Sequence, residues 1–304
     1  MREEIPGIAA LGAIFALCIL GGIAVSGLYP PEYRAFGEET DNPLNSVYYI
    51  LLILGFTGGI LLAVRLGGRK AIKGLFLGIT GFTVYFVLAP VLGQGLVEEA
   101  AVAVALELAV LLTYLLWRFP EWYVIDVAGV LMCVGLTAIL GLSFGILPAL
   151  LLLAMLAVYD FIAVYKTKHM IALADTVMAE SLPIMFVIPK HWGYSFLVKR
   201  KSLKEQIDSG ERRDALFMGL GDVVIPGALV VSAFYWLAED PSFLGVTGNL
   251  AVALLTLIGG LAGFALLMRA VLKGNPQAGL PLLNGGTIAA YLIASVAVYG
   301  TVAV

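Results

Sequence analysis

The stretch AVYDFIAVY (157–165) closes an apolar run that begins at Ile146, and Asp160 is the one charged residue of that run. A carboxylate at the centre of a bilayer costs about 2.5–3.5 kcal/mol, even on scales derived from helix insertion. A segment suited to lipid therefore contains a group that lipid disfavours. The rest of the chain has to explain why Asp160 is there.

The composition indicates a membrane protein. Of 304 residues, 61% are hydrophobic and only 13% are charged, whereas soluble domains carry roughly 25% charged residues. Apolar runs of bilayer-spanning length recur along the chain. We therefore predict an all-α polytopic membrane protein that forms one domain, residues 1–304. The net charge of −3 argues against a nucleic-acid partner. The nine predicted spans are 5–28, 46–64, 74–93, 100–117, 124–142, 146–165, 214–236, 247–268 and 279–302.

The basic residues predict the orientation of these spans. If the N-terminus is cytoplasmic, every one of the 18 Lys and Arg residues except Arg34 lies in or beside a cytoplasmic segment. Cytoplasmic loops carry the excess of Lys and Arg in membrane proteins. We therefore expect a cytoplasmic N-terminus and an extracytoplasmic C-terminus.

Four acidic residues fall within the predicted spans: Glu107, Asp126, Asp160 and Asp222. Asp126 lies close to the inner end of its span and is expected to reach interfacial water. Glu107 lies deeper, where we expect it to pair with a polar group of a neighbouring span. Neither residue is assigned a catalytic role.

Asp160 and Asp222 match each other in depth. Asp160 lies six residues before Lys166, which is roughly 9 Å along a helix. Asp222 lies eight residues after Asp214, roughly 12 Å along the next, antiparallel span. Two carboxyl groups held together in a low dielectric share a proton, so that one is an acid while the other is a base. We predict that Asp160 and Asp222 form such a pair.

Small residues and a proline accompany the predicted pair. Gly219, Leu220 and Gly221 directly precede Asp222, and the two glycines allow another backbone to approach closely. The ninth span begins with Pro281, Leu282 and Leu283, eight residues after Lys273. A proline at that place starts the helix and leaves irregular backbone beside the acids.

These motifs together resemble the presenilin and signal peptide peptidase family of intramembrane aspartyl proteases, whose pattern is YD, GxGD and PAL. Tyr159-Asp160 and Gly219-Leu220-Gly221-Asp222 match that pattern, and Pro281-Leu282-Leu283 departs from it by a Leu in place of Ala. The compact chain and its orientation are most similar to an archaeal presenilin homologue.

The resemblance implies hydrolysis of peptide bonds within transmembrane segments. Asp160 and Asp222 are then the catalytic residues, and Tyr159, Gly219, Leu220, Gly221, Pro281, Leu282 and Leu283 shape the site or bind substrate. This chemistry needs no metal and no cofactor. The implied partners are a transmembrane peptide or membrane-protein substrate and the lipid bilayer, and a homo-oligomer is compatible with the sequence. The alternative is a proton-coupled transporter or ion-leak channel that uses buried aspartates.

Two further segments carry weaker signals. The cytoplasmic segment 166–213 contains HMIALADTVMAE (169–180), with helical spacing of apolar residues, and the apolar stretch Ile184–Pro189. The first is predicted to lie along the membrane surface. The second is expected to cap the site, to pair with an extended substrate or to pack on the bundle. Gly141–Gly145 fits G-x-S-x-G around Ser143, but the histidines, His169 and His191, lie across the membrane, so that no serine triad is expected.

Overall fold

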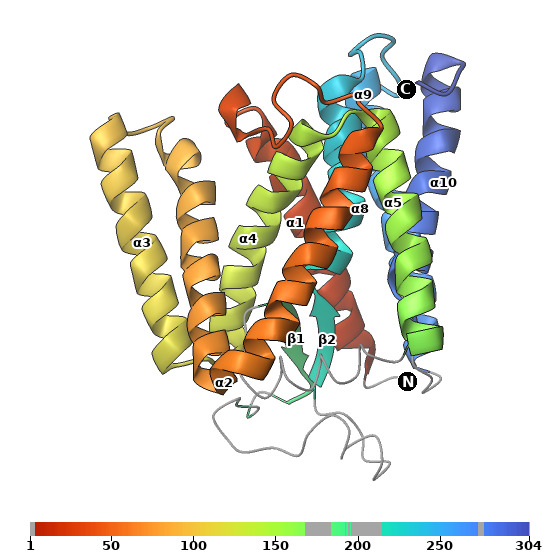
Figure 1. The fold of residues 1–304 in the computed structure, drawn as a ribbon. Helices are drawn as coiled ribbons and strands as arrows, with labels where there is room; N and C mark the ends of the chain where they lie inside the picture. The colour runs from red at the N-terminus through yellow and green to blue at the C-terminus, as the bar shows by residue number, and fades with distance from the viewer. Residues whose placement is uncertain are drawn as a thin grey trace. The chain divides into compact units, whose positions relative to one another are not determined.

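The computed structural model describes residues 4–167, 184–191, 193, 195, 215–272 and 277–303. The predicted surface helix at 169–180 lies outside these residues. Seven of the described helices are long and apolar enough to cross a membrane, and two shorter apolar helical segments, Leu44–Gly59 and Gly221–Trp236, accompany them. The chain is thus an all-α polytopic membrane protein, as predicted. Its helices are α1 Ile5–Ser26, η2 Pro31–Tyr33, α2 Leu44–Leu92, α3 Glu98–Arg118, α4 Trp122–Ser143, α5 Ile146–Ile162, η3 Ala163–Thr167, α8 Gly221–Trp236, α9 Gly248–Val271 and α10 Leu280–Tyr299 (Figure 1).

Two compact units make up the fold. The first unit contains Met1–Leu11, Leu54–Met132 and Thr167–Leu220. The second unit contains Gly12–Ile53, Cys133–Lys166 and Gly221–Val304. Both predicted aspartates, Asp160 and Asp222, belong to the second unit.

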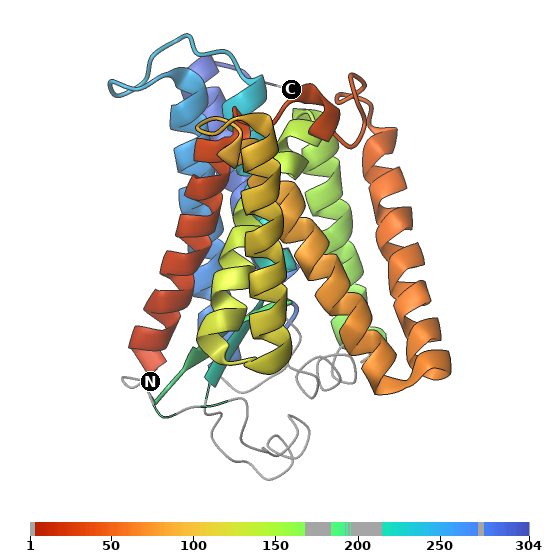
Figure 2. The same ribbon diagram turned by 90° about the vertical axis from the view of Figure 1, so that its left-hand side faces the viewer.

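One helical element replaces the predicted spans 46–64 and 74–93. The residues between them are also helical, so that α2 runs from Leu44 to Leu92. A straight helix of 49 residues would be roughly 74 Å long, more than twice the ~30 Å hydrocarbon core. α2, orange in Figure 2, accordingly contains two separate apolar segments, Leu44–Gly59 and Lys73–Leu92.

A two-stranded antiparallel sheet corrects the predicted seventh span. The span was expected to be helical from residue 214, but Ala215–Gly219 forms strand β2, and α8 begins only at Gly221. Strand β1, Met185–Pro189, pairs with β2 so that Val187 lies opposite Phe217. The segment ALFMG is apolar and short, and periodicity cannot distinguish a short buried strand from a buried helical turn.

Helix α8 is buried along most of its length. Every residue from Val223 to Ala233 is buried, and a helix that is apolar on all sides belongs in a core. Gly227 is needed there because a methyl group at this position would lie 2.6 Å from Thr137 Cγ2 of α4. α5, α9 and α10 all contact α8, and Asp222 lies in the first turn of this helix.

Candidate active site

Asp160 is the one inward-facing residue of its segment of α5. Its side chain is 6% exposed, whereas those of Tyr159, Phe161 and Ile162 are 45%, 54% and 42% exposed. The carboxylate therefore points into the second unit and the apolar neighbours point outward. This orientation answers the question raised by the sequence, because Asp160 does not meet lipid.

The backbone changes its winding directly after Asp160. Residues Ala163–Thr167 form a turn of π-helix that continues α5. The Ala163 N–H donates to the carbonyl oxygens of both Asp160 and Tyr159. Single π turns inside helices occur frequently at functional sites, and here the π turn begins three residues after the aspartate.

Asp222 lies in the first turn of α8 and is half-buried. The positive end of the helix dipole favours a carboxylate in this position. The predicted depth of roughly 12 Å assumed helical rise from Asp214. Because Ala215–Gly219 is a strand, which rises about 3.3 Å per residue, that calculation does not apply.

The backbone of Gly279 and Leu280 reaches both carboxylates. The Leu280 N–H donates to Asp160 Oδ2 at 3.0 Å, and the Gly279 amide also interacts with that carboxylate. A methyl group added at Gly279 would lie 3.7 Å from Asp222 Oδ1 and 3.9 Å from its Cγ. Two adjacent residues at the start of α10 thus contact Asp160 on one side and approach Asp222 on the other.

The free N–H groups at the start of a helix explain the hydrogen bond from Leu280 to Asp160. The first N–H groups of a helix have no partner within the helix. Pro281 lacks an N–H, and the N–H groups of Leu282 and Leu283 bond to the Gly279 carbonyl oxygen. The Leu280 N–H remains, and Asp160 from another helix accepts it.

Contacts of α10 with α9 and α5 hold this helix start in place. A methyl group at Gly263 of α9 would lie 2.3 Å from the carbonyl oxygen of Leu282, so that only glycine allows this approach. Asn284 is fully buried, and its Nδ2 donates to the Leu153 carbonyl oxygen of α5 at 2.9 Å. Sequence reasoning assigned no role to Gly279, Gly263 or Asn284. A glycine two residues before the helix-starting Pro281 and an asparagine in an apolar span were the available signals.

The remaining predicted site residues lie at three places. Pro281, Leu282 and Leu283 form the first turn of α10, beside the two residues that contact the acids. Tyr159 faces away from Asp160 on an exposed side of α5. Gly219 ends β2, and the N–H of buried Leu220 donates to the Ile184 carbonyl oxygen at 3.2 Å. Gly221 is exposed, with no atom within 4 Å of an added methyl group.

The other two intramembrane acids lie in different surroundings from those predicted. Asp126 is buried, and its Oδ1 accepts the Val187 N–H of β1 at 2.8 Å. It therefore does not rely on interfacial water. Glu107 is exposed in the middle of α3 and makes no hydrogen bond or ion pair within the part of the chain that the structure describes. The expected pairing with a neighbouring span is absent there.

Ser143 has a structural role. Its side chain is fully buried, its Oγ donates to the Ile139 carbonyl oxygen at 2.7 Å, and it accepts the Ala35 N–H at 2.8 Å. A serine nucleophile needs an adjacent base and an accessible Oγ. Ser143 instead joins the end of α4 to the segment before α2.

Comparison with known proteins identifies the family of the chain. A family model described as signal-peptide peptidase, presenilin aspartyl protease matches residues 12–299. The chain belongs to this family. Solved structures of a presenilin family intramembrane aspartate protease are similar to it over nearly the whole length. In one, the identity is 30%, the coverage is 94% of this chain and 95% of that chain, and the TM-score is 0.64. In another, the identity is 32%, the coverage is 95% and 97%, and the TM-score is 0.68. No curated protein matches the chain.

Membership of the presenilin family establishes the class of reaction. The protein is an intramembrane aspartyl protease, and therefore a hydrolase that acts on transmembrane substrates in the bilayer. Nothing in the fold or in these comparisons favours the transporter alternative.

Proposed function

We propose that Asp160 and Asp222 are the catalytic pair with which this protein hydrolyses peptide bonds inside transmembrane segments. The observation that carries the proposal is the shared contact with Gly279 and Leu280. Leu280 N–H bonds to one carboxylate, and a methyl group added at Gly279 would lie 3.7 Å from Oδ1 of the other. The Cα atoms of these adjacent residues are about 3.8 Å apart, which supports a common site for both acids.

The mechanism needs one ionised and one protonated carboxyl group. The ionised group takes a proton from a water molecule, which attacks the scissile carbonyl carbon. The protonated group donates its proton to the carbonyl oxygen, so that a tetrahedral gem-diol forms. Protonation of the amide nitrogen then allows the C–N bond to break. Two carboxyl groups and water supply every proton, so that the proposal invokes no metal or cofactor.

The Leu280 N–H assigns different roles to the oxygens of Asp160. Oδ2 accepts this N–H, and a backbone donor at a helix start orients a carboxylate. We therefore assign Oδ1 to the proton exchanged with Asp222 and water. We assign the role of holding that geometry to Pro281, Leu282 and Leu283, which form the turn behind Leu280.

The substrate is proposed to bind as an extended strand. A helical peptide bond is shielded and its carbonyl oxygen is already hydrogen-bonded, so that the substrate has to unwind. Val187 N–H bonds to Asp126 and not to the opposite Phe217. In an antiparallel ladder, Phe217 N–H and C=O then face away from β1. They offer an edge for strand addition, and β2 ends three residues before Asp222. Gly219, Leu220 and Gly221 link this edge to the acid.

The proposal also includes the orientation of the protein in the membrane and its assembly. We place the N-terminus in the cytoplasm and the C-terminus outside, from the distribution of Lys and Arg. The substrate is expected to enter with its N-terminus outside, and a homo-oligomer is compatible with this arrangement.

A peptide assay tests the proposed activity. Detergent-purified protein is incubated with a model single-span peptide, and mass spectrometry identifies the products. We expect two complementary fragments whose masses sum to that of the peptide plus one water. An intact peptide, with folded protein and several model sequences, would contradict the proposal.

A further inference from the structure

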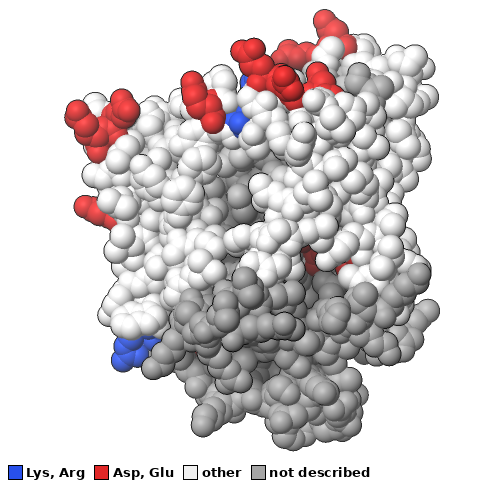
Figure 3. Space-filling view, viewed as in Figure 1, with Lys and Arg blue, Asp and Glu red and all other residues white. Residues whose placement is uncertain are grey.

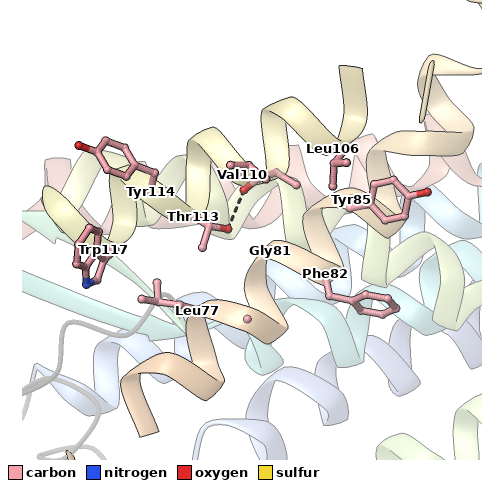
Figure 4. Close-up of a pocket in the computed structure, with 11 residues that line it drawn as sticks. Leu77, Gly81, Phe82, Tyr85, Leu106, Val110, Thr113, Tyr114 and Trp117 are labelled. Carbon is pink, nitrogen blue, oxygen red and sulfur yellow. Dashed lines mark hydrogen bonds between the residues drawn. The ribbon is translucent and has the colours of Figure 1, made fainter. Parts of the chain in front are cut away.

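A groove on the first unit has no part in the proposed reaction. It lies between the Lys73–Leu92 segment of α2 and α3, and its volume is ≈ 460 Å³. Figure 4 shows the side chains of both helices along it. The lining residues are Leu77, Gly78, Gly81, Phe82, Tyr85, Leu106, Ala109, Val110, Thr113, Tyr114 and Trp117.

The groove surface is apolar. The side chains of Phe82, Val110 and Trp117 are 66%, 61% and 59% exposed. The hydroxyl of Thr113 donates to the Ala109 carbonyl oxygen at 2.7 Å, so that its methyl group is left for contact. An occupant therefore needs an apolar chain and few hydrogen-bonding groups.

Two glycines give the groove its form. A methyl group at Gly81 would lie 2.6 Å from Thr113 Oγ1, so that this glycine lets α2 approach α3. A methyl group at Gly78 would meet no atom within 4 Å. Gly78 thus lies where the two helices leave space, and a larger residue there would fill the groove without a clash.

One end of the groove is basic. Trp117 at this end is followed by exposed Arg118, and Leu77 lies one turn after Lys73. The opposite end of α3 begins with Glu98 and Glu99. Figure 3 accordingly shows one basic patch, in blue, at the lower left and acidic side chains, in red, at the upper left. Basic clusters at membrane boundaries attract anionic lipid headgroups.

The length of the groove matches one leaflet. The lining residues of α2 run from Leu77 to Tyr85, which is roughly 12 Å of helix. Half of a ~30 Å hydrocarbon core is roughly 15 Å. A membrane-spanning helix needs the whole core, whereas one acyl chain needs half of it. The exposed carboxylate of Glu107 lies beside Leu106, at the end of the groove opposite Arg118. Its negative charge makes that end unsuited to an anionic headgroup.

We propose that the groove binds one acyl chain of an anionic phospholipid from the leaflet on the Arg118 side. The chain lies against Gly78, Val110 and Trp117, and the phosphate lies near Arg118 and Lys73. Arginine and lysine both bind phosphate by charge-assisted hydrogen bonds. The site is separate from the aspartate pair, and its occupancy does not depend on catalysis.

Native mass spectrometry of the delipidated, detergent-purified protein tests the acyl-chain part. Phosphatidylglycerol is titrated against wild type, Gly78→Leu and the matched control Gly58→Leu, because Gly58 is also exposed with nothing within 4 Å. We expect one tightly retained lipid on wild type and on Gly58→Leu, and at least tenfold weaker retention on Gly78→Leu. Val110→Trp, which fills the groove from α3, should act likewise. Equal retention by all four proteins would overturn the proposal, as would retention of a transmembrane peptide in preference to lipid.

Phosphatidylcholine tests the headgroup part. Wild type should retain phosphatidylglycerol several-fold better than phosphatidylcholine, and Arg118→Gln combined with Lys73→Gln should remove this preference. An unchanged preference in the double variant would contradict the assigned headgroup position. The thermal midpoints of all variants, measured without lipid, identify any loss that comes from unfolding.

Discussion

Asp160 combines two tasks in one side chain. Its Oδ2 accepts the Leu280 N–H that α10 cannot satisfy internally, and its carboxylate faces the same two residues that approach Asp222. A buried acid of this kind stabilises a helix start while it remains placed for chemistry. The side chain therefore belongs to the fold as much as to the proposed reaction, and an amide in its place keeps an acceptor for Leu280.

Gly279 provides a prediction at this scale. Its φ of −82° suits any L-residue, and an added methyl group would make ordinary contacts, 3.5 Å to Leu267 Cδ2 and 3.7 Å to Asp222 Oδ1. Gly279→Ala should thus fold normally but lower kcat several-fold, because the methyl group lies against the carboxylate. Gly279→Val should lower it further.

Gly285→Ala is the control for this series, since Gly285 is exposed and has no atom within 4 Å of an added methyl group. Peptide turnover and thermal midpoint are measured for each variant. Full activity of Gly279→Val would show that the approach of Gly279 to Asp222 has no part in the reaction.

At the scale of helices and strands, part of the fold and of the candidate site could be predicted from the sequence. Asp160 and Asp222 could be singled out from the sequence because a charge in an apolar run is conspicuous, but the depth estimated for Asp222 assumed a helix where Ala215–Gly219 forms a strand. Strand β2 was not predicted, because the segment ALFMG has no polar residue that would reveal the two-residue period of a strand. The roles of Gly263 and Asn284 depend on which helices become neighbours, and no local pattern reports that. The continuity of α2 was likewise not predicted, because the residues between the two predicted spans are themselves helical.

Gly263 gives a prediction for the α9–α10 contact. A methyl group there would lie 2.3 Å from Leu282 O and 3.0 Å from Leu282 C, so that backbone has to move. Gly263→Ala should destabilise the protein by about 1–3 kcal/mol and reduce turnover by displacing the start of α10. Gly260→Ala in the same helix is the comparison variant and should destabilise the protein less. A methyl group at Gly260 would approach the side chains of Thr287 and Phe15, which adjust more easily than backbone. Chemical denaturation that ranks the two variants in the opposite order would contradict this contact.

Glu107 gives a prediction for α3. Its exposed carboxylate lies near the middle of a span, where a charge costs about 2.5–3.5 kcal/mol on insertion scales. Glu107→Leu should therefore raise the thermal midpoint in liposomes, and Glu107→Gln should raise it less. A lower midpoint for Glu107→Leu would mean that the carboxylate is engaged by a partner in the membrane.

At the scale of the whole molecule, charge and aromatic residues mark the two membrane boundaries. Arg34, the one cation predicted to lie outside, donates to the Tyr235 hydroxyl at 3.1 Å and lies 5.1 Å from the Trp236 ring centre. Tyrosine and tryptophan collect at membrane interfaces. The start of α2 and the end of α8 are therefore expected at the outer boundary.

Cysteine reporters test this orientation. Reporters placed between Lys199 and Glu211 should react with a membrane-impermeant maleimide only from the cytoplasmic side, and reporters near Glu38 only from outside. Cys18 and Cys133 are buried and provide a low background. Reversed labelling would invert the molecule and the expected direction of the substrate.

The aspartate pair itself is tested most directly by peptide turnover of Asp160→Asn, Asp222→Asn and the double variant. Each amide keeps the size of the side chain but cannot exchange a proton, so that each single variant should lose at least about a thousandfold, or ~4 kcal/mol of transition-state stabilisation. Because the two groups act as one unit, the double variant should be no worse than either single variant. Glu107→Gln, the same chemical change at an intramembrane acid outside the site, should retain wild-type turnover. Substantial cleavage by either single aspartate variant, in folded protein, would contradict the assignment of Asp160 and Asp222 as the catalytic pair.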